Sequence, residues 1–213
     1  FVGAAHDRGR ISVRFGTVGG LLVIAAGIAL AAVTQVPVAL IARVPVKKFW
    51  RHVLEPWLIA FSTASSEAAF PMAMQNMEKM GVPKHIVSFV LPTGYSFNLD
   101  GSTLYLAVAS IFVAQAAGVD MPFGTQLVMM LTLMLTSKGV AAVPRASLVI
   151  LAGTLTQFGL PLEGIAVILG VDAFMDMART SVNLLGNCLA SVVMARWEGE
   201  FDDHAGEGDL PQA

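Results

Sequence analysis

The sequence predicts an all-α membrane protein of membrane-spanning helices plus two re-entrant helical hairpins, arranged as an inverted repeat. Hydrophobic residues make up 55% of the chain and charged residues 13%, whereas soluble domains carry about 25% charged residues. The mean hydropathy is +0.70. Long apolar segments alternate with pairs of half-length apolar segments joined by short polar tips. This alternation is typical of membrane proteins that contain inverted repeats.

The first part of the chain, residues 1–43, is predicted to hold a loop and one transmembrane helix. His6–Arg14 is polar, and Phe15–Ala42 is a charge-free run long enough to cross about 30 Å of hydrocarbon. Arg43–His52 is a basic segment that we expect to be a loop. Because the chain begins with Phe1, we expect further helices of a longer protein to precede it.

The next segments, about 46–80, are predicted to form the first hairpin. Val53–Ala64 and Ala68–Met77 are apolar but too short to span a bilayer at 1.5 Å per residue. Between them lies the polar tip Ser65-Ser66-Glu67, and the second piece ends in an expected loop at Glu78–His85. Two half-length pieces around a polar tip indicate a helical hairpin that enters and leaves on one side.

A broken spanning helix is expected over 84–117. Ile86–Ala117 is long enough to cross, but Asn98-Leu99-Asp100-Gly101-Ser102 interrupts it. Asn and Gly are poor helix formers, and a carboxylate at mid-depth is energetically costly. We therefore predict a discontinuous helix with an unwound centre.

A second hairpin is predicted over about 123–158. Phe123–Thr136 and Val140–Phe158 are its two arms, the tip is Ser137-Lys138-Gly139, and Pro144-Arg145 interrupts the second arm. If the two hairpins enter from opposite faces, their tips meet near the midplane. Half-helix N-termini there present free N–H groups to an anion, and unwound carbonyls face a cation.

The final spanning helix is expected over 164–196, followed by a disordered acidic tail over 198–213. The helix carries a polar stripe at spacings of 4, 3, 4 and 4 residues, so its members share one helix face: Asp172, Asp176, Arg179, Asn183 and Asn187. A charge at mid-membrane costs on the order of 2.5–3.5 kcal/mol on insertion scales, which favours a ligand or ion pathway in a transport protein. The alternative is a structural ion pair between Asp176 and Arg179, sealed inside a bundle.

Composition excludes several classes of function. The net charge of −2, with no basic stripe, gives no indication of nucleic-acid binding. The single cysteine, Cys188, excludes an internal disulfide.

By the positive-inside rule, the cytoplasmic side is expected to hold the basic segments Arg43–His52 and Glu78–His85 and the tail after Arg196.

Four motifs resemble the dicarboxylate/amino acid:cation symporter family, which includes bacterial glutamate transporter homologues. They are STASSEAAFP at Ser62–Pro71, SFNLDGS at Ser96–Ser102, TSKGVAAVPRAS at Thr136–Ser147 and DAFMDMARTSVN at Asp172–Asn183. The resemblance covers about 44–197, which would be the mobile transport core, with residues 1–43 closing the preceding scaffold. It implies a multi-pass protein of the cell inner membrane. It also implies a homotrimer, held by an N-terminal half absent from this chain, whose cores move across the bilayer as elevators.

The resemblance implies a site for an acidic amino acid. Asp176 would bind the α-ammonium group and Arg179 the side-chain carboxylate, in keeping with the bidentate geometry of Arg–carboxylate pairs. The full set implied by position is Ser65, Ser66, Ser102, Gly139, Val143, Asp176, Arg179, Thr180 and Asn183.

The resemblance also implies a coupling-ion site, with three departures from sodium-coupled members. Those members have an aspartate where this chain has Asn187, no ammonium at the position of Lys138, and often a serine at the position of Glu67. Because a hard cation prefers charged oxygen ligands, we expect coupling to protons, with no metal site or a weak Na+ site, and no other cofactor. The coupling-ion residues are Gly94, Asn98, Asp100, Asp172, Asn187 and Glu67, of which Asp100, Glu67 and Asp172 are candidate proton carriers.

Functions other than acidic amino-acid symport predict different sequence features. A C4-dicarboxylate transporter is expected to lack the aspartate at position 176, because its substrates have no ammonium group. A sodium-coupled glutamate symporter also stays open. An ion channel predicts a ring of pore-lining polar groups rather than one Asp/Arg pair. A serine protease would need a base next to Ser65 or Ser66; no His or Lys lies nearby in a helix motif and Glu67 is a poor substitute, so we expect no enzyme.

Overall fold

The computed structural model describes residues 33–139 and 146–205, and these residues form helices with no strand. The predicted all-α class is confirmed. Residues 33–41 are helical, and a short 3-10 turn, η1 (Ser137–Gly139), follows α6. The other helices are α2 (Val46–Thr63), α3 (Ser66–Met80), α4 (Lys84–Phe97), α5 (Asp100–Ala116), α6 (Phe123–Thr136), α7 (Ala146–Gln157) and α8 (Gly164–Glu198).

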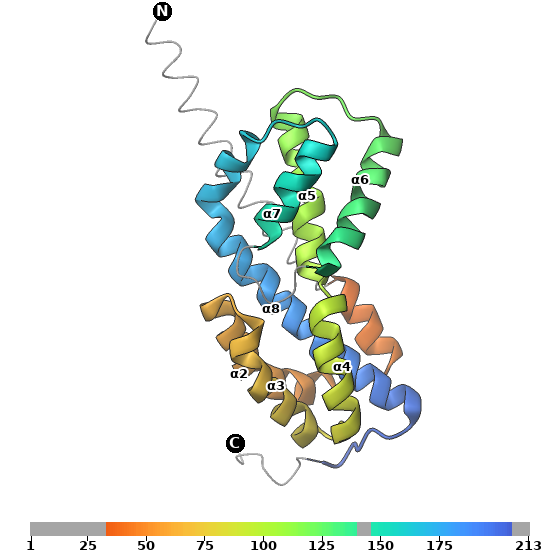
Figure 1. Cartoon of the computed structure of the whole chain (residues 1–213). Coiled ribbons are helices and arrows are strands. Elements are labelled where there is room, and N and C mark those ends of the chain that lie inside the picture. The colour runs from red at the N-terminus through yellow and green to blue at the C-terminus, as the bar shows by residue number, and fades with distance from the viewer. Residues whose placement is uncertain (1–32, 140–145, 206–213) are drawn as a thin grey trace, which may run out of the picture.

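Helix α8 is the axis of the structure, and two groups of helices pack on its two ends (Figure 1). The C-terminal half of α8 shares a hydrophobic core with α2, α3 and α4, and its N-terminal half shares one with α5, α6 and α7. The α2–α3 tip, the η1 turn at the end of α6 and the α4–α5 break lie at mid-height, beside the middle of α8. Non-helical backbone therefore converges on the stretch of α8 that carries its charges. Whether the pairs re-enter a membrane stays a prediction.

The first helix pair is more helical than the sequence suggested. The expected loop at Arg43–His52 is wrong from Val46 onward, because α2 begins there and buries Phe49 and Val53 on one face. Likewise, α3 continues through Glu78 to Met80. Gly81 then ends α3 in the left-handed conformation (φ 111°), its N–H bonded to the carbonyl of Glu78, a position where glycine carries no steric penalty.

The break in the spanning helix is shorter than predicted. Only Asn98 and Leu99 are non-helical, and α5 begins at Asp100. The N-cap residue Leu99 gives α5 no side-chain cap. Instead, the amide oxygen of Asn183 on α8 accepts the backbone N–H of Gly101 at 2.8 Å, so a neighbouring helix satisfies part of the new N-terminus.

The predicted disorder of the tail is wrong for residues 199–205, which fold back on the first helix pair. Arg196 at the end of α8 bonds both carboxylate oxygens of Asp203. The ammonium of Lys48 donates to the Asp203 carbonyl at 2.9 Å, and the N–H of Asp202 donates to the carbonyl of Gly81 at 3.0 Å. These contacts join α8 to α2 and to the α3–α4 turn. Residues 206–213 lie outside the described part.

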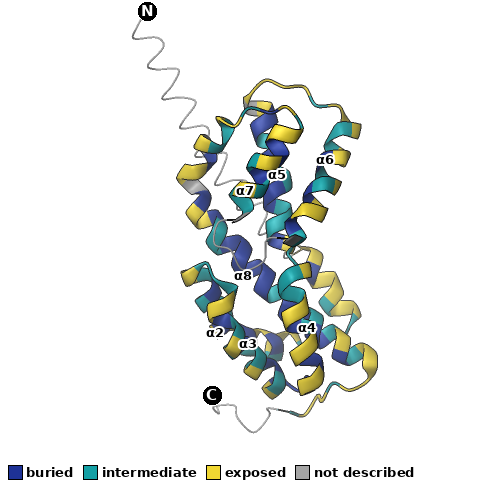
Figure 2. Cartoon of the chain, viewed as in Figure 1, coloured by how far each residue is buried: buried dark blue, intermediate teal, exposed yellow. Residues whose placement is uncertain are grey.

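Helices α6 and α7 have many exposed residues (Figure 2), and large apolar side chains are among them. Phe123 and Leu135 on α6 and Val149 on α7 are among their exposed large side chains. Within the described residues, one helical stretch, Lys84–Gln115, is long and apolar enough to cross a membrane by length and composition. Exposed apolar faces of this extent are expected where lipid or other helices cover them.

Candidate functional site

The three charged residues of the α8 stripe contact one another, with Arg179 between Asp172 and Asp176. Its Nε and Nη2 both bond Oδ1 of Asp176, at 2.9 and 2.8 Å. Its Nη1 lies 3.8 Å from Oδ1 of Asp172. The Arg179 and Asp172 side chains are 5% and 1% exposed, and that of Asp176 is 13% exposed. The spacing inferred from the sequence therefore brings all three charges into one buried cluster, with Asp176 at its more accessible edge.

Tyr105 on α5 completes this cluster. Its hydroxyl donates to Oδ1 of Asp172 at 3.1 Å, and the Arg179 guanidinium lies 4.5 Å from the centre of its ring, within the range of a cation–π interaction. Oδ2 of Asp172 and Nη1 of Arg179 are buried with no hydrogen-bond partner among the described residues. The cluster thus holds two carboxylates, one guanidinium and spare hydrogen-bonding capacity.

One turn further along α8, Asn183 ties the helix to the α4–α5 break. Besides accepting the N–H groups of Gly101 and Ser102, at 2.8 and 3.4 Å, it donates from Nδ2 to Oγ of Ser102 at 3.0 Å. Gly101 allows the close approach, since a Cβ there would lie 2.6 Å from the carbonyl oxygen of Arg179. The structure gives Asn183 and Ser102 a positioning role for α5, and their predicted contact with substrate stays a prediction.

Asn187, at the far end of the stripe, packs against α4. A Cβ on Gly94 would lie 2.5 Å from Oδ1 of Asn187, so glycine is the residue that lets the helices pack this closely. Oδ1 of Asn187 is buried without a partner among the described residues. Gly94 and Asn187, two predicted coupling-ion residues, therefore contact one another, with a neutral carbonyl oxygen between the helices.

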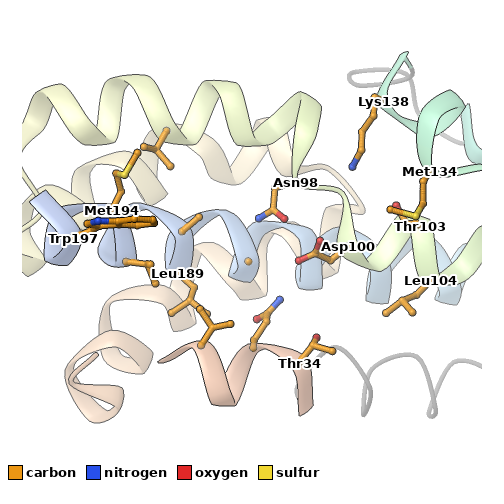
Figure 3. Close-up of a pocket in the computed structure, with 16 residues that line it drawn as sticks. Thr34, Asn98, Asp100, Thr103, Leu104, Met134, Lys138, Leu189, Met194 and Trp197 are labelled. Carbon is orange, nitrogen blue, oxygen red and sulfur yellow. The ribbon is translucent and has the colours of Figure 1, made fainter. Parts of the chain in front are cut away.

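A cavity of about 700 Å³ lies next to the α4–α5 break (Figure 3). Asn98 lines it from the break itself, Asp100 from α5, and Lys138 from η1, and Gln35 lines it from residues 33–41. Both amide atoms of Gln35 are buried and without a partner among the described residues. The four side chains bring together oxygen donors, one carboxylate and one ammonium.

The groups at this break are oxygen donors suited to a hard monovalent cation or a proton. The described residues contain no group of three His, Cys, Asp or Glu side chains that could hold a metal ion. Asn98 and Asp100 are separated from Asp172 and Asp176 along the chain, and they lie beside Gly186 on α8, where a Cβ would come 3.3 Å from Oδ2 of Asp100. Two polar regions therefore flank α8: the charged cluster and the break.

The first hairpin tip lies at the start of α3. Oγ of Ser65 accepts the N–H of Ala68 at 3.4 Å and caps α3, while Ser66 and Glu67 form its first turn. Glu67 is exposed and accepts the hydroxyl of Tyr95 on α4 at 3.1 Å. The polar tip thus presents the N-terminus of a half-helix, an arrangement that favours anions.

At the second tip, Gly139 lies in η1, and Val143 falls outside the described residues. Thr180 is buried on α8 next to Arg179. Among the predicted substrate residues of α5 and α8, Ser102 contacts Asn183 and Asp176 contacts Arg179. The structure shows the tip of α3 as a separate, accessible N-terminus.

Residues 5–197 match the family model described as the sodium:dicarboxylate symporter family. The chain belongs to this family. The predicted resemblance is thereby confirmed, and membership also agrees with the exposed apolar surface, because the family consists of membrane transporters.

Relatives of this symporter-family chain carry names that differ in substrate and ion. A proton/sodium-glutamate symport protein of Geobacillus stearothermophilus is 54% identical over 73% of this chain and 37% of its own length. A proton/glutamate-aspartate symporter of Escherichia coli is 53% identical over 71% and 35%. A C4-dicarboxylate transport protein of Bacillus subtilis is 47% identical over 73% and 37%. The chain therefore spans well under half the length of the relatives it matches.

Two residues beside these polar regions were not predicted from the sequence. Tyr105 could have been suspected as a hydroxyl-bearing ring in an apolar helix, and Gln35 as an amide within the charge-free run 15–42. Neither has a periodic relation to the stripe on α8, because each comes from a different helix. Only the packing of α5 and of residues 33–41 on α8 places them beside it.

Proposed function

We propose that the full-length protein is a secondary active symporter for glutamate or aspartate, coupled to protons. The observation that carries this proposal is the buried Asp176–Arg179 pair on α8, at the level of both hairpin tips. A zwitterionic amino acid with an acidic side chain carries one ammonium and two carboxylates. Asp176 supplies an acceptor for the ammonium, and Arg179 is the bidentate partner for a carboxylate.

Charge balance explains why such a site would work as a symporter. The cluster of Asp172, Asp176 and Arg179 carries a formal charge of −1, and an acidic amino acid adds another −1. Two net negative charges in a low-dielectric site are strongly unfavourable. A co-transported cation removes one of them, so binding of substrate and binding of cation favour one another.

In the bound state, Arg179 would keep Asp176 in place through Nε and Nη2, and its Nη1 and the second N–H of Nη2 would bind the side-chain carboxylate. The second carboxylate would lie at the N-terminus of α3, where Ser65 and Ser66 present backbone N–H groups. The second hairpin tip, with Gly139 and Val143, would close over the substrate. Thr180, Asn183 and Ser102 would complete the wall of the site.

A proton suits this chain better than Na+ as the coupling cation. Asn187 offers a neutral oxygen, and an ammonium already occupies the second hairpin tip at Lys138. Asp100, Glu67 and Asp172 are the candidate proton carriers. Of these three, Asp172 already accepts a hydrogen bond from Tyr105 and lies 3.8 Å from Nη1 of Arg179.

Two alternatives agree with the names of relatives. The family includes C4-dicarboxylate transporters, but their substrates would leave the carboxylate of Asp176 without an ammonium partner. A sodium-coupled glutamate symporter would bind Na+ through backbone and amide oxygens near Gly94 and Asn98. An ion channel fits less well, because one ion-paired cluster is not a pore-lining ring, and we propose no enzymatic activity.

We further propose that the full-length protein is a multi-pass homotrimer of the cell inner membrane. Its N-terminal scaffold would hold the trimer, and the core described above would move as an elevator. The exposed apolar faces of α6 and α7 support contact with lipid or with such a scaffold.

Competition binding tests the proposed substrate. The full-length protein, purified in detergent, is incubated with radiolabelled glutamate and increasing unlabelled competitor. We expect glutamate and aspartate to displace the label at similar concentrations, and succinate only at much higher ones. Equal displacement by succinate would favour the C4-dicarboxylate alternative.

A further inference from the structure

The end of α4 is a negatively polarised helix terminus inside the protein. α4 stops at Phe97, where the last carbonyls of the helix lack intrahelical partners and carry the negative end of its dipole. The ammonium of Lys138 donates a hydrogen bond to the Phe97 carbonyl. Lys138 comes from the second hairpin, 41 residues further along the chain, so this single contact joins the hairpin tip to the helix break.

A carboxylate lies on the other side of the same break. Asp100 opens α5 and lines the 700 Å³ cavity together with Asn98 and Lys138 (Figure 3). Among the described residues that line this cavity, Asp100 and Lys138 are the two charged ones. The ammonium of Lys138 thus binds a helix carbonyl end and lines the same cavity as a carboxylate, an environment that favours a monovalent cation.

The backbone that carries Lys138 is anchored. Ser137 is 1% exposed, and its hydroxyl donates to the carbonyl of Met134 at 3.1 Å. The η1 turn also packs directly against α4. The η1 turn therefore holds the backbone from which the Lys138 side chain reaches the end of α4.

We propose that Lys138 is a tethered cation that takes the place of Na+ at the α4–α5 break and so makes the protein independent of sodium. This inference rests on the proposed function and specifies its ion selectivity. A Na+ ion within about 4 Å of a fixed ammonium, at an effective dielectric of about 20, loses more than a hundredfold in affinity. The same ammonium offsets the negative polarity of the α4 carbonyl end and lines the cavity that Asp100 also lines.

The test replaces Lys138 in the full-length protein and measures glutamate affinity in two salts. Lys138→Met keeps the length of the side chain and removes its charge, and Lys138→Arg keeps the charge. Lys79→Met, at an exposed position at the end of α3, is the matched control. Glutamate Kd is measured at one pH in NaCl and in N-methyl-D-glucamine chloride of equal ionic strength.

Wild type, Lys138→Arg and Lys79→Met are expected to bind glutamate equally in both salts. Lys138→Met is expected to bind at least about tenfold more tightly in NaCl than in N-methyl-D-glucamine chloride. Equal affinity of Lys138→Met in both salts overturns the proposal, as does a sodium requirement in the wild type. If Lys138→Met binds no glutamate, binding of ²²Na+ is measured instead. The proposal then requires saturable ²²Na+ binding to Lys138→Met and none to the wild type. Absence of ²²Na+ binding to the variant overturns the proposal.

These outcomes separate the inference from the proposed function. A wild-type protein that fails to bind glutamate in either salt refutes the acidic amino-acid assignment, whatever Lys138 does. A wild type that binds glutamate without sodium, together with a Lys138→Met variant that behaves identically, refutes only the role of Lys138.

Discussion

Replacing Arg179 by alanine separates a ligand-binding role from a purely structural one. In the structure, Arg179 bonds Asp176 twice, lies 3.8 Å from the 1%-exposed Asp172, and covers the ring of Tyr105. Removing one partner of a buried charge pair costs about 3–5 kcal/mol. We therefore expect Arg179→Ala to lower the melting temperature of the full-length protein markedly.

Glutamate affinity is expected to fall as well, and by a predictable amount. Two charge-assisted hydrogen bonds to a carboxylate are each worth about 1.5–3 kcal/mol, and 1.4 kcal/mol corresponds to a factor of ten. Loss of Arg179 should therefore weaken glutamate binding by at least about a hundredfold. Binding of radiolabelled glutamate to purified protein gives the measurement.

A second variant removes the more deeply buried of the two carboxylates, Asp172 and Asp176, that Arg179→Ala leaves unpaired. Combining it with Asp172→Asn should recover much of the melting temperature, because the buried carboxylate is neutralised while the hydrogen bond from Tyr105 can persist. Glutamate binding should stay lost. Recovery of near-normal affinity in the stabilised double variant would show that the pair is only structural and would refute the carboxylate-binding role.

Three further variants test other parts of the account. Asp176→Ser should weaken glutamate binding by about 1.5–3 kcal/mol but leave succinate binding little changed; equal losses for both ligands would contradict an ammonium contact. Asn183→Ala removes a cap from α5 and should cost about 0.5–2 kcal/mol of stability with faster hydrogen exchange at Gly101, whereas unchanged exchange would count against the cap. The hydrogen bond from Arg196 lowers the pKa of Asp203 below its usual range, so the tail contact should persist at neutral pH and be lost as the pH falls through that lowered pKa. Hydrogen exchange of residues 199–205 should follow this transition, and Asp203→Asn should abolish it; exchange that is insensitive to both would contradict the contact.

The sequence predicted those features of the fold that depend on local periodicity. The stripe on α8 follows from residue spacing alone, and the structure places Asp172, Asp176 and Arg179 in contact. The interruption near Asn98 follows from poor helix formers beside a costly carboxylate. The motifs then identified the family, because their order and spacing carry more information than composition.

What the sequence did not predict depends on contacts between distant segments. The break ends at Leu99 rather than Ser102 because Asn183 caps α5 from another helix. The tail is ordered through residue 205 because Asp203 meets Arg196 and Lys48, the latter 155 residues away. No local pattern encodes such partners.

The most direct test of proton-coupled acidic amino-acid symport is uptake of radiolabelled glutamate into proteoliposomes of the full-length protein. An inward proton gradient is imposed in sodium-free medium, and a sodium gradient without a pH difference is imposed separately. We predict accumulation with the proton gradient alone and its collapse on addition of a protonophore. A strict sodium requirement, with no response to the proton gradient, would contradict the account.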